Sequence, residues 1–375
     1  MKQSLGIYVH VPFCLKKCFY CDFCSFPGST DERIRDYVSE LCRRMVQFAP
    51  KARNDRVDTI YFGGGTPTLL PIDCFGELLA CLRSEYDVAE RCEITCECNP
   101  ATADFAKLSE LRRMGINRLS IGLQSIHDGE LARLGRAHSF SDFQNIFADA
   151  RRAGFDNISA DLMYGIPEQT KESFRQSLIT LAELEPEHIS AYGLKIEEGT
   201  VFDACADTLI LPDEDTEYEM YRLFGEVLAR YGYEKYEISN FAKAGKASRH
   251  NLRYWLGEDY VGFGVAAHSC FGGVRWGNSR DLSAFLRGEE IVEERFELTE
   301  KDAFNEYVML RLRLREGIDG ADFCRRFGKT LYEAFPQLPS LIQNGWLAEA
   351  EGRVFFTDQG FFVSNAILSD LLCFD

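Results

Sequence analysis

Three cysteines near the start of the chain are spaced to bind a soft metal centre. Cys14, Cys18 and Cys21 form a C-x3-C-x2-C pattern directly after a strand-like run at residues 6–11. Cysteine thiolates are the usual ligands of iron–sulfur clusters, and a [4Fe–4S] cluster is normally held by four of them. Three ligands at this spacing would leave one iron without protein sulfur, open to a small molecule.

A structural zinc site is the alternative for the same cysteines. Zinc sites usually combine one C-x2-C pair with a second pair farther along the chain. Cys96 and Cys98 are spaced too closely to form such a pair, whereas Cys24 offers a fourth thiol near the first three. The spacing therefore favours a cluster, and it leaves zinc open.

The composition is typical of a globular protein from a reducing compartment. The 375 residues are 46% hydrophobic and 27% charged, and no apolar run is long enough to cross a bilayer. The chain begins with one lysine and then a strand rather than a secretory signal, so we expect a cytoplasmic protein whose 14 cysteines stay reduced or bind metal. The net charge of −17 makes a nucleic acid an unfavourable partner, although a local basic groove could still bind RNA.

Strand-like and helix-like segments alternate through roughly the first 230 residues and would position the cysteine loop. The predicted strands are 5–11, 57–62, 93–98, 117–123, 157–162 and 188–195. The predicted amphipathic helices are 31–48, 71–86, 102–114, 127–153, 170–184 and 213–231. Consecutive βα units imply a parallel sheet with right-handed crossovers. Because a closed (β/α)8 barrel needs two more units, we expect an α/β protein with an incomplete parallel (β/α)6 barrel, with a doubly wound open sheet as the alternative.

One face of several predicted strands is polar, although strands of parallel sheets are usually apolar on both faces. Isolated buried carboxylates are costly, so Glu97 and Asp161 are unusual members of such a face. The pattern predicts a barrel lumen built for a polar ligand. The alternating polar residues are Tyr8, His10, Thr95, Glu97, Ser120, Gly122, Gln124, Ser159 and Asp161.

The pattern changes beyond about residue 235. We expect a partial-barrel core at 1–235, a connecting α+β segment at 236–298 and a smaller C-terminal α+β domain at 299–375. In the last of these, short helices are followed by a hairpin at 346–357 and a helix near 360–372. Helices followed by a small hairpin resemble a winged-helix module, for which packing against the barrel is favoured over DNA binding.

A glycine-rich turn after the second predicted strand supports the interpretation of the cysteine loop. Residues 63–68 read Gly-Gly-Gly-Thr-Pro-Thr, and glycines at the C-terminal end of a barrel strand let the backbone approach a ligand closely. The spacing is not that of a Rossmann fingerprint, and a tight turn alone would explain it equally well. With Glu97, Gln124, Arg136 and Asp161, however, it places the candidate groups at strand C-terminal ends.

The ordered series of motifs resembles the radical S-adenosylmethionine (SAM) superfamily. Within it, the chain is most similar to the group that contains oxygen-independent coproporphyrinogen III dehydrogenase and the HemW-type heme chaperone. The resemblance covers nearly the whole chain. Besides the three cysteines, its motifs lie at residues 8–14, 63–68, 97–100, 120–124, 134–136, 161–167 and 250–255.

The resemblance implies a cofactor set and its ligands. Cys14, Cys18 and Cys21 would hold a [4Fe–4S] cluster, and the amino and carboxylate groups of SAM would chelate its open iron. Tyr8, Gly64 and Glu97 match positions that contact this SAM. A second SAM lies nearby in the dehydrogenase, and its contacts match Tyr20, Gly65, Thr66, Gln124, Arg136, Asp161 and Lys195. In the reductive chemistry of the family, a cellular electron donor supplies the electron that the cluster passes to the sulfonium.

Two features separate the branches of this group. The dehydrogenase has a fourth cysteine, C-x3-C-x2-C-x-C, and a sizeable N-terminal extension, whereas Phe23 stands at the fourth position here and 13 residues precede Cys14. Cys21-Asp22-Phe23 and the motif from His250 to Trp255 resemble the chaperone branch. This implies a protein that binds heme as cargo and delivers it to apo-hemoproteins such as cytochromes. Coproporphyrinogen dehydrogenase activity is the alternative, and whether the protein is an enzyme is left open.

His250 is the candidate axial ligand for heme, because imidazole is a standard heme ligand and aromatic residues follow it in the motif. A histidine hydrogen-bonded in an ordinary interdomain loop is the alternative. Two further hypotheses for the whole chain remain. One is a radical SAM enzyme that modifies RNA, and the other is a binding module with an inert zinc site.

Overall fold

A curved sheet of 12 strands forms the frame of the protein, of which the computed structural model describes residues 3–372. Six of its strands form a parallel series, each hydrogen-bonded to the next, and a seventh parallel strand joins them from residues 236–298. In the described residues the sheet stays open, with edge strands β14 (Val292–Glu297) and β9 (Glu234–Lys235). The predicted incomplete barrel is therefore confirmed. The six parallel strands are β1 (Gln3–Val11), β4 (Asp55–Gly64), β5 (Val88–Cys98), β6 (Arg118–Gln124), β7 (Ile158–Tyr164) and β8 (His188–Gly193).

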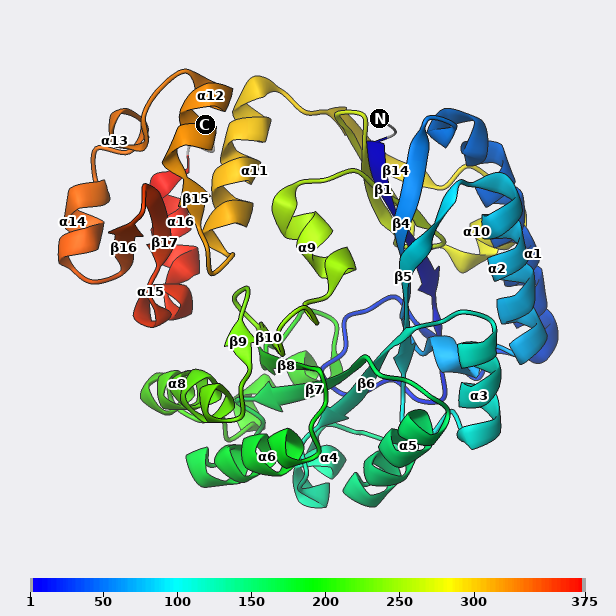
Figure 1. Ribbon diagram of the computed structural model, residues 1–375. Coiled ribbons are helices and arrows are strands. Elements are labelled where there is room, and N and C mark those ends of the chain that lie inside the picture. The colour runs from blue at the N-terminus through cyan, green and yellow to red at the C-terminus, as the bar shows by residue number, and fades with distance from the viewer. Residues whose placement is uncertain (1–2, 373–375) are drawn as a thin grey trace.

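Helices cover the convex face of these strands (Figure 1). They are α1 (Asp31–Phe48), α2 (Ile72–Glu85), α3 (Phe105–Arg113), α4 (Asp128–Arg133), α5 (Phe140–Arg152), α6 (Lys171–Glu183) and α8 (Glu214–Arg230). No helix in the part of the chain that the structure describes is both long enough and apolar enough to cross a membrane.

The prediction of one helix over 127–153 was wrong, because the chain turns sharply in the middle of that stretch. Gly135 takes a φ of +72°, a left-handed conformation that favours glycine and ends α4. Ser139 then starts α5 with a capping box, in which the side chains of Ser139 and Asp142 each accept from the other's backbone N–H. The break brings the segment after Gly135 to the cysteine loop, where Arg136 contacts Cys18.

The alternation along β1 sets the two faces of the barrel. Ile7, Val9 and Val11 are fully buried and join the main apolar core with residues of α1 such as Val38. Side chains of the other set face inward, because successive residues of a strand point to opposite faces. The same alternation in β5, β6 and β7 gives the barrel its polar lumen.

Residues 236–298 add strands to both edges of the barrel sheet. β10 (Asn240–Ala242) pairs with β8 and with β9. On the other side, β11 (Tyr260–Phe263) runs parallel to β1, and β12 (His268–Phe271), β13 (Val274–Asn278) and β14 follow as an antiparallel meander. This stretch of the chain also contains α9 (Arg249–Leu256) and α10 (Leu282–Leu286).

The C-terminal residues form a smaller body with its own apolar core. The predicted hairpin is confirmed as β16 (Leu347–Ala350) and β17 (Arg353–Phe356), and β15 (Ile318–Asp319) adds a third strand that was not predicted. The single helix predicted near 360–372 is instead two, α15 (Asp358–Phe362) and α16 (Ser364–Leu371). The remaining helices are α11 (Glu300–Leu312), α12 (Gly320–Phe327), α13 (Leu331–Ala334) and α14 (Leu338–Gln343).

A nearly buried lysine joins this body to the barrel. Lys235 has a side chain only 8% exposed, and it forms an ion pair with Asp358 at 2.8 Å. Its ammonium also lies 4.6 Å from the ring centre of Tyr221, 5.4 Å from that of Phe241 and 5.1 Å from that of Phe361. Cation–π contacts of this kind hold segments from α8, β10 and α15 together.

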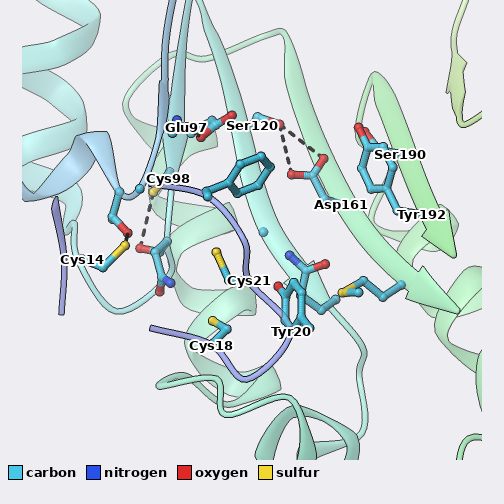
Figure 2. A pocket seen from close by; sticks show the side chains of 18 of the residues that line it. Cys14, Cys18, Tyr20, Cys21, Glu97, Cys98, Ser120, Asp161, Ser190 and Tyr192 are labelled. Carbon is cyan, nitrogen blue, oxygen red and sulfur yellow. Dashed lines mark hydrogen bonds between the residues drawn. The ribbon is translucent and has the colours of Figure 1, made fainter. Parts of the chain in front are cut away.

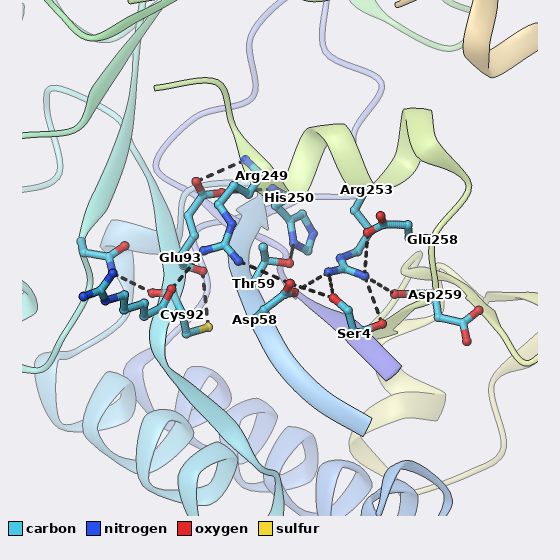
Figure 3. Close-up of polar contacts among 12 residues, drawn as sticks. Ser4, Asp58, Thr59, Cys92, Glu93, Arg249, His250, Arg253, Glu258 and Asp259 are labelled. Atoms are coloured by element: carbon cyan, nitrogen blue, oxygen red, sulfur yellow. Dashed lines mark hydrogen bonds and ion pairs between the residues drawn. The ribbon is translucent and has the colours of Figure 1, made fainter. Parts of the chain in front are cut away.

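Helix α9 lies on the concave side of the sheet, where two anchors hold it (Figures 1 and 3). At its start, the carboxylate of Glu93 accepts from the backbone N–H groups of Arg249 and His250 at 3.2 and 3.0 Å. A carboxylate at a helix N-terminus satisfies free donors and complements the helix dipole. This anchor ties α9 to β5.

Arg253 is the second anchor and is 2% exposed. Its guanidinium forms an ion pair with Asp58 and donates to the Ser4 side chain at 2.6 Å and to the Asp259 carbonyl at 3.1 Å. Gly6 leaves space for this side chain, because a Cβ at that position would collide with Arg253. The helix is thus clamped to β1 and β4 by one buried cation.

We expect Arg253→Met to lower the free energy of unfolding by about 3 kcal/mol, because it removes the buried cation beside Asp58 and the donor to the Ser4 and Asp259 carbonyls. Arg249→Met is the matched control. Arg249 pairs with the same Asp58 at 3.3 Å but is 47% exposed, so its loss should cost less than about 1 kcal/mol. Denaturant unfolding of both variants checks this, and equal losses would contradict the assigned role of Arg253.

Candidate cofactor-binding site

A cavity of about 540 Å³ opens into the polar lumen at the C-terminal ends of the parallel strands. Figure 2 shows Cys14, Cys18 and Cys21 at one end and Asp161, Ser190 and Tyr192 at the other. Of the residues predicted for the site, those that border the cavity are Cys14, Cys18, Cys21, Tyr20, Gly64, Gly65, Thr66, Glu97, Gln124, Arg136, Asp161 and Lys195. The structure therefore brings nearly the whole predicted set together.

The loop after β1 presents the three cysteines to this cavity. Cys14 ends the short strand β2 (Phe13–Cys14), and its sulfur accepts from the Thr66 hydroxyl at 3.6 Å. The sulfur of Cys18 accepts from the Arg136 guanidinium at 3.6 Å. These donors stabilise negative charge on sulfur, which a metal ligand must carry.

The donor set fits an iron–sulfur cluster. Burial raises the pKa of the Cys14 thiol, and it raises the pKa of Cys21 to about 11, so binding of iron must displace protons there. Within the described residues, no three His, Cys, Asp or Glu side chains are close enough together to hold one metal ion. In a cubane each cysteine binds a different iron atom, so the three thiols need not converge on one point.

The glycine-rich turn after β4 is packed beneath the cysteine loop. The backbone N–H of Gly65 donates to the Val11 carbonyl at 2.9 Å, and that of Thr66 donates to the Phe13 carbonyl at 2.7 Å. A Cβ on Gly65 would lie 2.7 Å from the Phe13 oxygen, which is too close for any other residue type. Gly64 has a φ of +111° and directs its N–H to Glu97 at 3.0 Å.

Glu97 is a half-buried carboxyl in the wall of the cavity. It accepts from the Tyr61 hydroxyl and from the Gly64 N–H, each at 3.0 Å. Burial raises the pKa of Glu97 to about 7, and the nearby Asp161 adds to this effect. The two hydrogen bonds lower the pKa and so oppose it. A cationic ligand would stabilise the charged form, because opposite charges attract strongly in a buried site.

The opposite wall holds Asp161 and the residues at the end of β6. Asp161 accepts from Ser120 at 3.2 Å and from Ser159 at 3.4 Å, and burial raises its pKa. Arg136, brought in by the break after α4, donates to the Gly122 carbonyl at 2.9 Å. Gln124 ends β6 in a left-handed conformation, with a φ of +72°. Carboxylates and a guanidinium on facing walls are suited to an amino-acid-like, cationic ligand.

Two predicted residues lie elsewhere. Tyr8 borders a second groove, where its hydroxyl donates to His10 Nδ1 at 2.9 Å, although its ring stacks on Tyr61 with centroids 6.2 Å apart. His250 is buried and borders neither cavity, and both of its ring nitrogens are hydrogen-bonded, to Thr59 at 2.9 Å and to Tyr254 at 2.8 Å. Its imidazole has no free nitrogen for iron in this conformation. Heme ligation by His250 stays a prediction.

Sequence reasoning missed several residues that border the cavity. Arg118 is 1% exposed, and its Nε has no hydrogen-bond partner among the described residues. It lies two positions before Ser120 on β6, so extending the polar alternation by one step would have found it. Asn251 also borders the cavity, from α9, and other missed residues there include Tyr61, His188, Ser190 and Tyr192.

We expect replacement of any one of Cys14, Cys18 or Cys21 by Ala to abolish stable cluster assembly. Cys24→Ala is the matched control in the same loop. The Cys24 thiol is directed to the Arg280 carbonyl at 3.8 Å, so its loss should leave the cluster intact. Iron and acid-labile sulfide, measured in protein purified without oxygen, check this. Loss of the cluster in the Cys24 variant would contradict the three-ligand assignment.

The pKa of Glu97 predicts a pH dependence for the SAM that the resemblance implies. Because the carboxyl is protonated below about pH 7 and charged above it, SAM affinity should rise between pH 6 and pH 8. Glu97→Gln should weaken binding at pH 8 by roughly 10- to 100-fold and remove the carboxyl's part of that rise.

Glu237→Gln is the control for this measurement. Burial also raises the pKa of Glu237 to about 7, but Glu237 does not border the cavity. Calorimetric titration of the cluster-loaded variants with SAM distinguishes them. An unchanged pH profile in Glu97→Gln would show that this carboxyl does not meet the ligand.

Comparison with known proteins agrees with this site. The model of the Radical SAM superfamily matches residues 8–181, and that of the HemN C-terminal domain matches residues 298–363. The solved structure of coproporphyrinogen III oxidase (HemN) from Escherichia coli superimposes with a TM-score of 0.88 over 100% of this chain and 91% of that one. At 24% identity, this likeness shows the fold alone.

Two curated relatives match over almost their full lengths. The heme chaperone HemW of Bacillus subtilis is 35% identical over 97% of this chain and 98% of its own. The heme chaperone HemW of Escherichia coli is 34% identical over 97% of both chains. The superfamily implies a [4Fe–4S] cluster and SAM, for which the cysteines and the polar lumen provide a fitting site. This chain belongs to the HemW family of the radical SAM superfamily.

Proposed function

We propose that this protein is a cytoplasmic heme chaperone, which binds heme and delivers it to apo-hemoproteins such as cytochromes. The observation that carries the proposal is the full-length likeness to two proteins named heme chaperones. The likeness to the oxidase concerns the fold. The [4Fe–4S] cluster and SAM are resident cofactors in this proposal, and heme is the cargo.

The position of Phe23 favours the chaperone over the dehydrogenase. It stands where the dehydrogenase pattern has its fourth cysteine, and its side chain is 66% exposed. A large apolar side chain at the surface beside the cysteine loop is suited to an apolar ligand rather than to metal. The thiol of Cys24, one position later, is buried and is not among the groups that border the main cavity.

Residues of the lumen would hold and orient SAM. The Glu97 carboxylate would accept hydrogen bonds from the methionine part of SAM, and the glycine N–H groups would donate to it. Asp161 would accept from an ammonium or from ribose hydroxyls. Arg136 would bind a carboxylate through two N–H groups. When bound, the cluster supplies a single electron to the sulfonium, and a cellular electron donor would have to restore it.

The test is a heme titration of cluster-loaded protein in the absence of oxygen. We expect a saturable Soret band, and transfer of that heme to an added apo-cytochrome. The same preparation, given coproporphyrinogen III, SAM and a reductant, should leave the porphyrinogen unconverted. Formation of protoporphyrinogen IX would support the dehydrogenase instead, and the absence of any saturable heme binding would refute the chaperone function.

A further inference from the structure

A second groove of about 330 Å³ lies on the other side of the cysteine loop from the main cavity. Asp22 and Phe23 border both, so this short segment separates them. The groove is completed by side chains from β1, α9, β11 and β12 and by Arg280. Exposed residues at its rim open it to solvent. Of the described residues that match SAM contacts, Tyr8 alone borders this groove.

His268 is the exposed imidazole of this groove. It begins β12, borders the groove, and its ring makes no hydrogen bond to another described residue. In the sheet it lies opposite Gly277, where a Cβ would come within 2.9 Å of the His268 ring. The glycine therefore leaves the ring room to lie across β13 with its nitrogens free.

The other histidines are already engaged. His10, His188 and His250 each use both ring nitrogens in hydrogen bonds. His127 and His138 each bond a backbone carbonyl and border neither cavity. Among the described residues, His268 is thus the histidine that both borders a cavity and has a lone pair free for a metal.

The walls of the groove are suited to a flat aromatic ligand. Tyr254 and Tyr260 meet edge to face, with ring centroids 4.6 Å apart and planes at 88°, and Tyr8 lies beside them. The exposed ring of Phe23 forms the rim. Aromatic side chains of this kind pack against planar rings with specific geometry. The groove is large enough to enclose one edge of a porphyrin and to leave the other edge in solvent, which is suited to cargo that is handed on.

A cation stands at the rim for an acidic substituent of such a ligand. The side chain of Arg280 is 63% exposed and that of Asp22 is 47% exposed, and the two form an ion pair at 3.3 Å. An exposed pair of this length contributes little, so the guanidinium is available to a ligand carboxylate, which it can bind through two N–H groups. Porphyrin propionates have this chemistry.

We propose that this groove is the heme site and that His268 is the axial ligand of the heme iron. The inference rests on the proposed chaperone function and names its site. The propionates face Arg280, and the ring packs between Phe23 and the two tyrosines. His250, predicted from the sequence to bind iron, instead supports the groove from behind by holding the Tyr254 hydroxyl at 2.8 Å.

The site shares a wall with the cluster loop. Asp22, Phe23 and Cys24 follow the cluster ligand Cys21 directly, and the Cys24 carbonyl accepts from His10 Nε2 at 2.9 Å. Because that buried bond holds the segment, we expect an ordered cluster loop and a formed groove to go together. We therefore expect heme affinity to fall when the cluster is absent, although the proposed iron ligand lies outside the cluster loop.

The test compares heme binding by the wild type, His268→Gly, His250→Gly and His127→Gly, each as cluster-loaded full-length protein titrated with hemin without oxygen. We expect His268→Gly to bind heme at least about tenfold more weakly, since loss of even an outer-shell partner of a metal typically costs 10- to 100-fold. It should also lose the imidazole spectrum of ferric heme, and free imidazole should restore that spectrum. Iron and sulfide contents should match the wild type, which shows that the variant is folded.

A second pair of variants tests the rim. Arg280→Gln and Asp22→Asn break the same ion pair, but only the first removes the cation. We expect weaker heme binding in Arg280→Gln and no weakening in Asp22→Asn, because the loss of the Asp22 carboxylate leaves the guanidinium free for a propionate. Iron and sulfide contents are measured in both variants. Equal effects of the two would contradict propionate binding by Arg280.

The outcomes separate the site from the function. If the wild type shows no saturable heme binding, the proposed function fails. If the wild type binds heme and His268→Gly binds it with the same affinity and spectrum, the function stands and this site is wrong. If His250→Gly loses the imidazole spectrum of ferric heme and His268→Gly keeps it, His250 is the axial ligand instead of His268.

Discussion

The attachment of the cysteine loop to the glycine turn is the constraint on which the rest of the structure depends. Two backbone hydrogen bonds, from Gly65 to Val11 and from Thr66 to Phe13, hold the end of β1 against the end of β4. They require that no side chain stands between the two segments, which Gly65 ensures. Three thiols on an otherwise irregular loop are thereby placed at a fixed position over the lumen.

The charged groups of the lumen lower the stability of the fold. Glu97, Asp161 and Arg118 are charged groups enclosed by the barrel, and burial raises the pKa of both carboxyls. Groups of this kind destabilise a fold unless they are hydrogen-bonded or meet a ligand of opposite charge. Serine and tyrosine hydroxyls satisfy the carboxylates here, and the free Nε of Arg118 leaves one polar atom without a partner. These enclosed charged groups are therefore suited to binding a ligand rather than to stabilising the fold.

Much of the site followed from the sequence because its signals are local. The cysteine spacing, the glycine turn and the alternation of Ser120 with Ile121 are each properties of short segments. The features that were not predicted depended on long-range packing. The break at Gly135 depends on a contact with the cysteine loop. The burial of His250 depends on the contacts that α9 makes with β4 and β5. Strand-edge pairing of β11 with β1, likewise, has no signal in a single segment.

The lysine between the barrel and the C-terminal body limits how the chain can be shortened. A polypeptide that stops before α11 would lack Asp358 and Phe361, and so Lys235 would lose its counter-ion and one of the rings that cover it. The ring of Tyr221, now packed in the C-terminal core, would face water. Removal of the last segment would therefore expose apolar surface at the barrel edge as well.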